Sequence, residues 1–297
     1  MIVTKYRLAP LFWFKLTGSL MALALGANAS AQVANTVTGT DQNALFGVDD
    51  NIQSFLSANR GDAGGGDQSL QGGDAVEGTE DADLLIGALG IDVLFGNGGD
   101  DVLIGGTEDF NPFNRDRAFG GSGDDAFIWA PGDGNDFFDG GEGTDVLLLG
   151  LVGEQRDATG NTEGAPFFAV NPPNRDGSQD FDGIFTDASS GLPLVDIANG
   201  PGFCEVVDGS TDAAEQATID DLELDHIVRF TLRGPAADAA NPDTGLRIAV
   251  HLTNTEFLVC GGETAGEVVV LDLTTSPPTP SDVSQLPRQS FDLITTR

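Results

Sequence analysis

The amino-acid sequence predicts an all-β protein made of two different parts. Between Gly78 and Leu148 one nine-residue unit recurs, in which a Gly-rich turn and an Asp precede a short apolar strand. After Leu149 the repeat stops, and short runs of alternating polar and apolar residues lie between clusters of Pro, Gly, Asp and Asn. Such runs are typical of half-buried strands joined by turns. The second part is therefore expected to be a small antiparallel β domain, sandwich-like in form.

The repeat keeps its register through seven units. The clearest copies are GALGIDVLF from Gly87, GNGGDDVLI from Gly96, GGSGDDAFI from Gly120 and GGEGTDVLL from Gly140. The others are GTEDADLLI from Gly78, a copy from Gly105 with six inserted residues, and PGDGNDFFD from Pro131. The sixth position is always acidic, at Asp83, Asp92, Asp101, Asp116, Asp125, Asp136 and Asp145. Two residues after each Asp comes an apolar residue that we expect to point inward in one stack: Leu85, Leu94, Leu103, Ala118, Phe127, Phe138 and Leu147.

This unit resembles the RTX (hemolysin-type) calcium-binding nonapeptide, G-G-x-G-x-D-x-U-x, over about a quarter of the chain. The resemblance implies a parallel β-roll over residues 76–150, in which two units make one coil. It also implies that ions are held between turns two units apart. The alternative is a flexible tract rich in Gly and Asp, which the strict spacing from Asp to the apolar residue disfavours.

The resemblance also implies the metal ligands. Ca²⁺ takes about 6–8 oxygens from carboxylates and carbonyls, and Gly tolerates the φ > 0 that turns several carbonyls toward one point. The expected ligands are the seven Asp residues of the repeat together with Gly96, Gly98, Gly120, Gly121, Gly123, Gly140, Gly141 and Gly143. We expect several Ca²⁺ ions, about three to five.

The two edges of such a roll should not bind calcium equally. Units that begin at Gly78, Gly96, Gly120 and Gly140 stack along one edge, called the odd edge. Units that begin at Gly87, Gly105 and Pro131 form the even edge, where the inserted loop interrupts both possible sites. The sequence therefore predicts about three ions on the odd edge, with Asp101 and Asp125 each serving two neighbouring layers.

The charge of the chain agrees with cation binding. It carries 47 Asp and Glu against 13 Lys and Arg, a formal net charge of −34. Such a charge argues against nucleic acid, whose phosphates attract Lys and Arg. Residues 76–149 hold 17 acidic residues and two Arg, so repulsion should oppose folding without cations. Metal binding and folding are then one equilibrium. Outside the repeats, the acidic excess is better explained by solubility or by life in high salt.

Residues 1–31 have the features of a cleaved secretory signal. Lys5, Arg7 and Lys15 precede or flank a short apolar stretch, and Ala29-Ser30-Ala31 is a small-residue cleavage site. The alternative is an uncleaved anchor, but the stretch is far below the ~20 residues that span a bilayer. Residues 32–75 are expected to be a flexible lead-in rich in Gly and Asp. No transmembrane segment is expected in the mature chain.

Residues 151–297 contain the candidate strands of the second part, whose role the sequence does not indicate. The alternating runs 226–233 and 246–253 suggest a β-hairpin with a long loop, and 256–260 and 267–273 are further strand candidates. The Pro-rich segment from Ser276 breaks any strand, so an irregular tail is expected. Cys204 and Cys260 are expected to form a disulfide in an exported protein; two unpaired thiols are the alternative.

No catalytic or organic-cofactor motif is found. His226 and His251 do not form H-E-x-x-H, and Ser122 lies in a repeat turn rather than in G-x-S-x-G. We therefore expect an exported calcium-binding protein, not an enzyme, with a structural or adhesive role at or outside the cell surface and with glycans or surface components as candidate partners. The alternatives are a secreted polysaccharide-active enzyme with the roll as a folding module, or a passive calcium buffer or surface-layer component. An N-terminal signal is unusual for this family, so a periplasmic location is also open.

Overall fold

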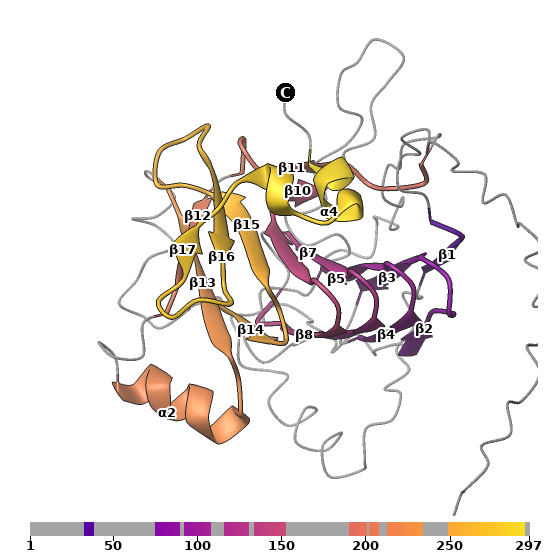
Figure 1. Ribbon diagram of the computed structural model, residues 1–297, viewed down its shortest axis with the longest axis horizontal. Coiled ribbons are helices and arrows are strands. Elements are labelled where there is room, and N and C mark those ends of the chain that lie inside the picture. The colour runs from indigo at the N-terminus through magenta and orange to yellow at the C-terminus, as the bar shows by residue number, and fades with distance from the viewer. Residues whose placement is uncertain are drawn as a thin grey trace, which may run out of the picture.

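The computed structural model describes residues 33–38, 75–89, 92–107, 116–130, 134–152, 190–200, 202–207, 213–233 and 249–294. These residues form two large β-sheets that face each other and a few short helices (Figure 1). The expected all-β class and the parallel β-roll are confirmed. The signal, most of the lead-in and the loop inserted after Gly105 lie outside the described residues.

The first sheet has eight strands. In spatial order they are β1 (Asn35–Thr38), β3 (Asp83–Leu89), β5 (Val102–Thr107), β7 (Ala126–Trp129), β9 (Val146–Leu149), β15 (Phe257–Gly261), β16 (Val268–Asp272) and β17 (Thr279–Pro280). The second sheet has seven. They are β12 (Gly202–Val206), β13 (His226–Leu232), β14 (Ala249–Thr253), β8 (Phe137–Glu142), β6 (Arg117–Ser122), β4 (Val93–Gly98) and β2 (Ala75–Glu77). β10 (Leu151–Val152) and β11 (Val195–Asp196) pair separately.

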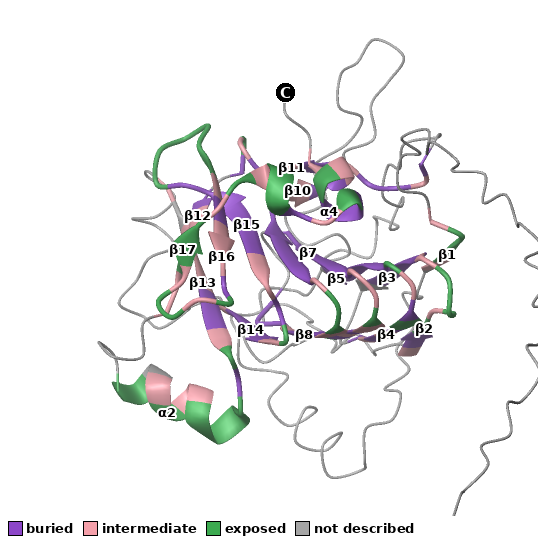
Figure 2. Ribbon diagram, viewed as in Figure 1, coloured by how far each residue is buried: buried purple, intermediate pink, exposed green. Residues whose placement is uncertain are grey.

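The roll arises because the chain passes alternately from one sheet to the other. Each strand pairs in parallel with the strand one coil later, so that Leu85 faces Leu103 and Leu103 faces Phe127. The inward stack expected from the repeat is confirmed, since all seven of its apolar side chains are fully buried (Figure 2). The rings of Phe127 and Phe138 stack across the interior with centroids 5.4 Å apart. The repeat register thus places every Asp at the beginning of a strand.

The C-terminal strands continue both sheets of the roll. β15 pairs in parallel with β9, and β14 pairs in parallel with β8. Beyond these contacts the strands are antiparallel, including the expected hairpin of β13 and β14. Val250 and Leu258 lie in the same buried cluster as Leu147. The antiparallel part therefore has a common core with the roll.

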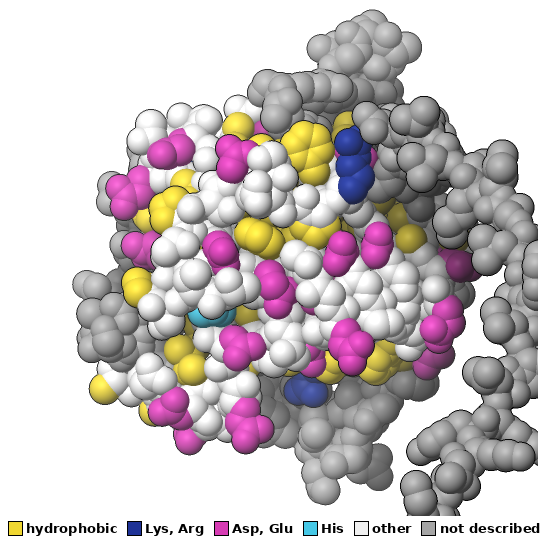
Figure 3. Space-filling model, viewed as in Figure 1, with side chains coloured by type: hydrophobic (Ala, Val, Ile, Leu, Met, Phe, Trp, Pro, Cys, Tyr) yellow, Lys and Arg dark blue, Asp and Glu magenta, His cyan; other side chains and the backbone are white. Residues whose placement is uncertain are grey.

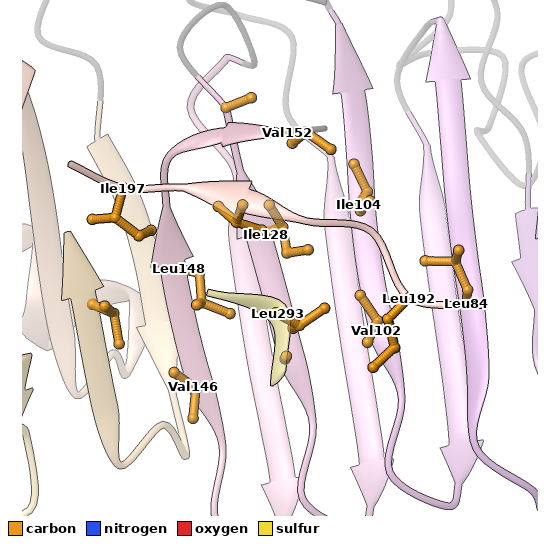
Figure 4. Close-up of a cluster of buried hydrophobic side chains, with 14 of the residues drawn as sticks. Leu84, Val102, Ile104, Ile128, Val146, Leu148, Val152, Leu192, Ile197 and Leu293 are labelled. Atoms are coloured by element: carbon orange, nitrogen blue, oxygen red, sulfur yellow. The ribbon is translucent and has the colours of Figure 1, made fainter. Parts of the chain in front are cut away.

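A second apolar cluster covers the outer face of the first sheet. Ile128 and Leu148 point outward from β7 and β9, and contact residues of the segment 190–197 and of helix α4 (Arg288–Leu293), including Leu293 (Figure 4). The tail expected to be irregular instead contains β17, the 3-10 helix Val283–Gln285 and α4. Among the described residues, no helix is long and apolar enough to cross a membrane.

Cys204 of β12 and Cys260 of β15 form the expected disulfide, with Cα atoms 6.1 Å apart. The bond joins β12 of the second sheet to β15 of the first sheet. Helix α2 (Ala213–Leu222) precedes β13 and has a largely exposed surface.

Candidate metal centre

The odd edge consists of the turns that lead from the second sheet into the first. In three of its turns the second and fourth positions have a left-handed backbone: Asn97 and Gly99 (φ 74° and 98°), Gly121 and Gly123 (108° and 137°), and Gly141 and Gly143 (101° and 150°). Residues other than Gly disfavour this left-handed backbone region, although Asn tolerates it better than most. The glycines at these two positions are therefore required by the turn, and they stack closely on the same positions of the next turn.

The repeat Asp residues form a ladder along each edge. On the odd edge, the backbone N–H of Asp83 donates to Oδ1 of Asp101 at 2.7 Å, and Asp101 and Asp125 donate to the next Asp at 2.8 Å each. On the even edge, Asp92 donates to Asp116 at 2.7 Å and Asp116 to Asp136 at 3.1 Å. All seven Asp residues have no exposed surface. One carboxylate oxygen of each later Asp thus joins two coils.

The second carboxylate oxygen has no such donor in three of the four Asp residues on the odd edge. Oδ2 of Asp101, Asp125 and Asp145 is buried and accepts no hydrogen bond. Burial raises the pKa of these groups to about 7, 7 and 8, because removal from water disfavours the charged form and neighbouring carboxylates add repulsion, while the ladder hydrogen bond partly opposes the rise. Each oxygen therefore lacks the positive partner that a buried carboxylate requires.

Carbonyl oxygens from the next coil lie beside these Oδ2 atoms. A Cβ placed on Gly96 would contact both Oδ2 of Asp101 and the carbonyl oxygen of Gly120, and one placed on Gly120 would contact Oδ2 of Asp125 and the carbonyl oxygen of Gly140. A carboxylate and a carbonyl from successive coils thus converge on one point, which suits a hard cation that binds oxygen. Within the part of the chain that the structure describes, no group of three or more His, Cys, Asp and Glu side chains could hold a metal. Backbone carbonyls would supply the other ligands.

The first turn of the odd edge differs from the later turns in the surroundings of its Asp. Oδ2 of Asp83 accepts hydrogen bonds from the backbone N–H (2.6 Å) and the hydroxyl (2.8 Å) of Thr79, and Oδ1 accepts one from Nδ2 of Asn35 (2.6 Å). The side chain of Asn97 donates to the carbonyl oxygen of Gly78 at 3.0 Å. The turn also has Asp81 where the repeat has Gly. Protein donors therefore satisfy the Asp83 carboxylate, and its expected role as an ion ligand stays a prediction.

The even edge is only partly described. A Cβ on Gly87 would contact the carbonyl oxygen of Gly105 and, at 2.5 Å, Oδ2 of Asp92, as on the odd edge. Residues 90–91, 108–115 and 131–133 of its turns lie outside the described residues. The expected difference between the edges stays a prediction.

The sequence pattern missed two residues that extend the odd-edge ladder. The backbone N–H of Asp145 donates to Oε2 of Glu256 at 2.7 Å, and a Cβ on Gly140 would contact the carbonyl oxygen of Asn254. The available signal was an acidic residue directly before the apolar run Phe257–Gly261. A shorter turn conceals the similarity to the repeat.

Comparison with known proteins agrees with this geometry. The RTX calcium-binding nonapeptide repeat family matches residues 77–109 and 132–151, in four copies. This segment of the chain therefore belongs to the RTX calcium-binding repeats, as its turns and Asp ladder indicate. No curated protein and no solved structure matches the chain. The family supports calcium binding and the β-roll.

Proposed function

We propose that this protein is an exported calcium-binding protein whose roll is stabilised by Ca²⁺ on its odd edge, with a structural or adhesive role at or outside the cell surface. The observation that carries the proposal is the pair of buried, unbonded Oδ2 atoms of Asp101 and Asp125. Each lies beside a carbonyl oxygen of the next coil. Asp101, Asp125 and the carbonyls of Gly120 and Gly140 would hold the ions.

Bound Ca²⁺ would supply positive charge to buried carboxylates that otherwise repel one another. Asp and Glu side chains are spread over the face shown in Figure 3, and Lys and Arg are sparse there. This distribution leaves few basic side chains to neutralise the carboxylates. An ion that binds only the folded state stabilises it by about 2.7 kcal/mol when free Ca²⁺ is a hundredfold above Kd. The ions would therefore stabilise the fold.

The melting temperature of the mature protein tests calcium binding. It should rise strongly in millimolar Ca²⁺ relative to chelator, and much less in Mg²⁺, which prefers a smaller and stricter octahedral shell. An identical transition in all three conditions would refute the proposal.

The biological role requires separate assays. Two points support the proposal that the protein is exported: the expected signal at residues 1–31, and the fact that RTX-repeat proteins are typically exported. Calcium-dependent binding to cells or glycans would support the adhesive role over a passive calcium buffer. Cleavage of a polysaccharide would instead favour an enzyme that uses the roll as a folding module.

A further inference from the structure

The odd edge continues beyond the last nonapeptide into the C-terminal strands. Thr253 of β14 pairs with Asp139 of β8, and Phe257 of β15 pairs with Val146 of β9. The residues between β14 and β15 therefore occupy the next layer above the turn that begins at Gly140. That turn has six residues between Asp139 and Val146, whereas only three separate Thr253 and Phe257.

Asn254 begins this short turn in the position of a repeat Gly. Its φ of 47° is left-handed. Its backbone N–H donates to Oδ2 of Asp225 at 2.8 Å, and its side-chain amide donates to Oδ1 of Asp139 at 2.9 Å. These two bonds hold its carbonyl oxygen next to Gly140. In the preceding layer the carbonyl oxygen of Gly140 lies in the same way next to Gly120.

Glu256 ends the turn in the position of a repeat Asp. Its Oε2 accepts the ladder hydrogen bond from Asp145 at 2.7 Å, in place of the Oδ1 of a further Asp. Its backbone N–H donates to the carbonyl oxygen of Asp145 at 3.0 Å, which fixes the two residues side by side. The additional methylene of Glu compensates for the shorter turn.

The second oxygen of Asp145 has no donor. Asp145 has no exposed surface, and its Oδ2 accepts no hydrogen bond. A Cβ on Gly140 would contact both this Oδ2 and the carbonyl oxygen of Asn254. This is the same pair of oxygens that converges beside Gly96 and Gly120.

We propose that Asp145, the Asn254 carbonyl and Glu256 form a further divalent-cation site, suited to Ca²⁺, outside the nonapeptide repeats. The inference rests on the proposed function. Compared with the arrangement predicted from the sequence, it places the ions of the odd edge one coil further toward the C-terminal strands. In the layer at Gly78, Thr79 and Asn35 already donate hydrogen bonds to the Asp83 carboxylate, so we expect no ion there. The layer above Gly140 holds one. The C-terminal strands therefore contribute a ligand to the roll as well as covering its end.

The test compares Glu256→Gln with the wild type and with Glu263→Gln, the same change at an exposed position. Bound calcium is counted by equilibrium dialysis, at a free concentration that just saturates the wild type, and melting is measured in chelator and in Ca²⁺. Gln can still accept the ladder hydrogen bond but loses the charge. We expect one ion fewer and a smaller calcium-induced rise in melting temperature, while Glu263→Gln resembles the wild type.

In chelator, Glu256→Gln should melt at about the same temperature as the wild type, because the Gln carbonyl can still accept the hydrogen bond from the backbone N–H of Asp145. A purely structural role for Glu256 would instead lower melting equally in chelator and in Ca²⁺. That result, or an unchanged ion count, would overturn the inference. A wild type that binds no Ca²⁺ would overturn the proposed function itself, so the two failures are distinct.

Discussion

The two oxygens of each buried Asp on the odd edge have different surroundings. In Asp101 and Asp125, Oδ1 accepts the backbone N–H of the preceding coil, while Oδ2 lies beside a carbonyl of the following coil. One carboxylate therefore contacts both neighbouring coils, and whether it serves two ion layers stays a prediction. An Asn at the same position could still accept the hydrogen bond from the preceding coil. It would bind Ca²⁺ more weakly, since a neutral amide oxygen binds Ca²⁺ less strongly than a carboxylate does.

Asp125→Asn should remove far more calcium affinity than Asp116→Asn. Asp125 follows an intact turn, whereas Asp116 follows the six-residue insertion on the even edge. Both side chains are fully buried and both accept a ladder hydrogen bond, so the structural cost of the two changes is matched. Calcium titration by calorimetry measures the difference. Equal losses would show that the edge assignment is wrong.

The metal-free protein should become less stable as pH rises from 5 to 8. In the fold the pKa values of Asp101, Asp125 and Asp145 are raised to about 7, 7 and 8, against 3.8 for an ordinary Asp. The folded state therefore binds more protons than the unfolded chain in this range, and its stability falls as those protons are lost. Thermal melting in chelator across the range tests this expectation.

Saturating Ca²⁺ should reverse the trend, because an ion must displace these protons and so binds more tightly at higher pH. A metal-free melting temperature that is flat or rises between pH 5 and 8 would contradict the proposed surroundings of the three carboxyls.

The turns of the odd edge show what sequence reveals at the scale of one element. The Gly spacing predicted φ > 0, and Gly121, Gly123, Gly141 and Gly143 have it. The spacing did not reveal that Thr79 closes the first turn, because a hydrogen bond to Asp83 has no repeat signature. Nor did it reveal Glu256, because the shorter turn leaves the nine-residue period.

Gly123→Ala should be much more destabilising than Gly266→Ala. Both glycines have a left-handed backbone, with φ of 137° and 87°, so both substitutions incur the strain of an L side chain, roughly 1–2 kcal/mol. A Cβ on Gly123 would also meet the backbone carbonyl of Gly99, whereas one on Gly266 meets nothing within 4 Å. Melting in Ca²⁺ compares the two. Equal shifts would mean that close stacking of the turns contributes nothing to stability.

The sequence of the strands in the first sheet indicates that other segments cover their outer face. Leu84, Val102 and Val146 make these strands apolar on both faces, as in sheets that are buried on both sides. The covering segments are 190–197 and α4. They were not predictable, since nothing in their own sequence specifies which distant strand they contact.

At the scale of the whole molecule, the roll and the C-terminal strands are joined in three ways. Both sheets run through the boundary near Leu149, the buried cluster of the roll extends into β13, β14 and β15, and the disulfide connects the two sheets. The sequence predicted two successive parts because the composition changes at Leu149. The composition of a segment reflects only its local repeat. It does not indicate that β15 pairs with β9, because the paired residues lie more than a hundred positions apart in the sequence.

The two parts should therefore unfold in one transition. Trp129 of β7 packs on Phe230 of β13, with ring centroids 5.0 Å apart, and is the only Trp that remains after removal of residues 1–31. Its fluorescence reports the contact between the parts, and far-ultraviolet circular dichroism reports the strands of both.

In Ca²⁺ the two signals should change at the same urea concentration, as expected of a two-state transition. Because two of the three proposed ions are held by roll residues alone, a shared fold also requires that the whole circular-dichroism transition shifts to lower urea in chelator. A roll that responds to calcium while the C-terminal strands unfold at an unchanged urea concentration would show that the continuous sheets do not couple the two parts.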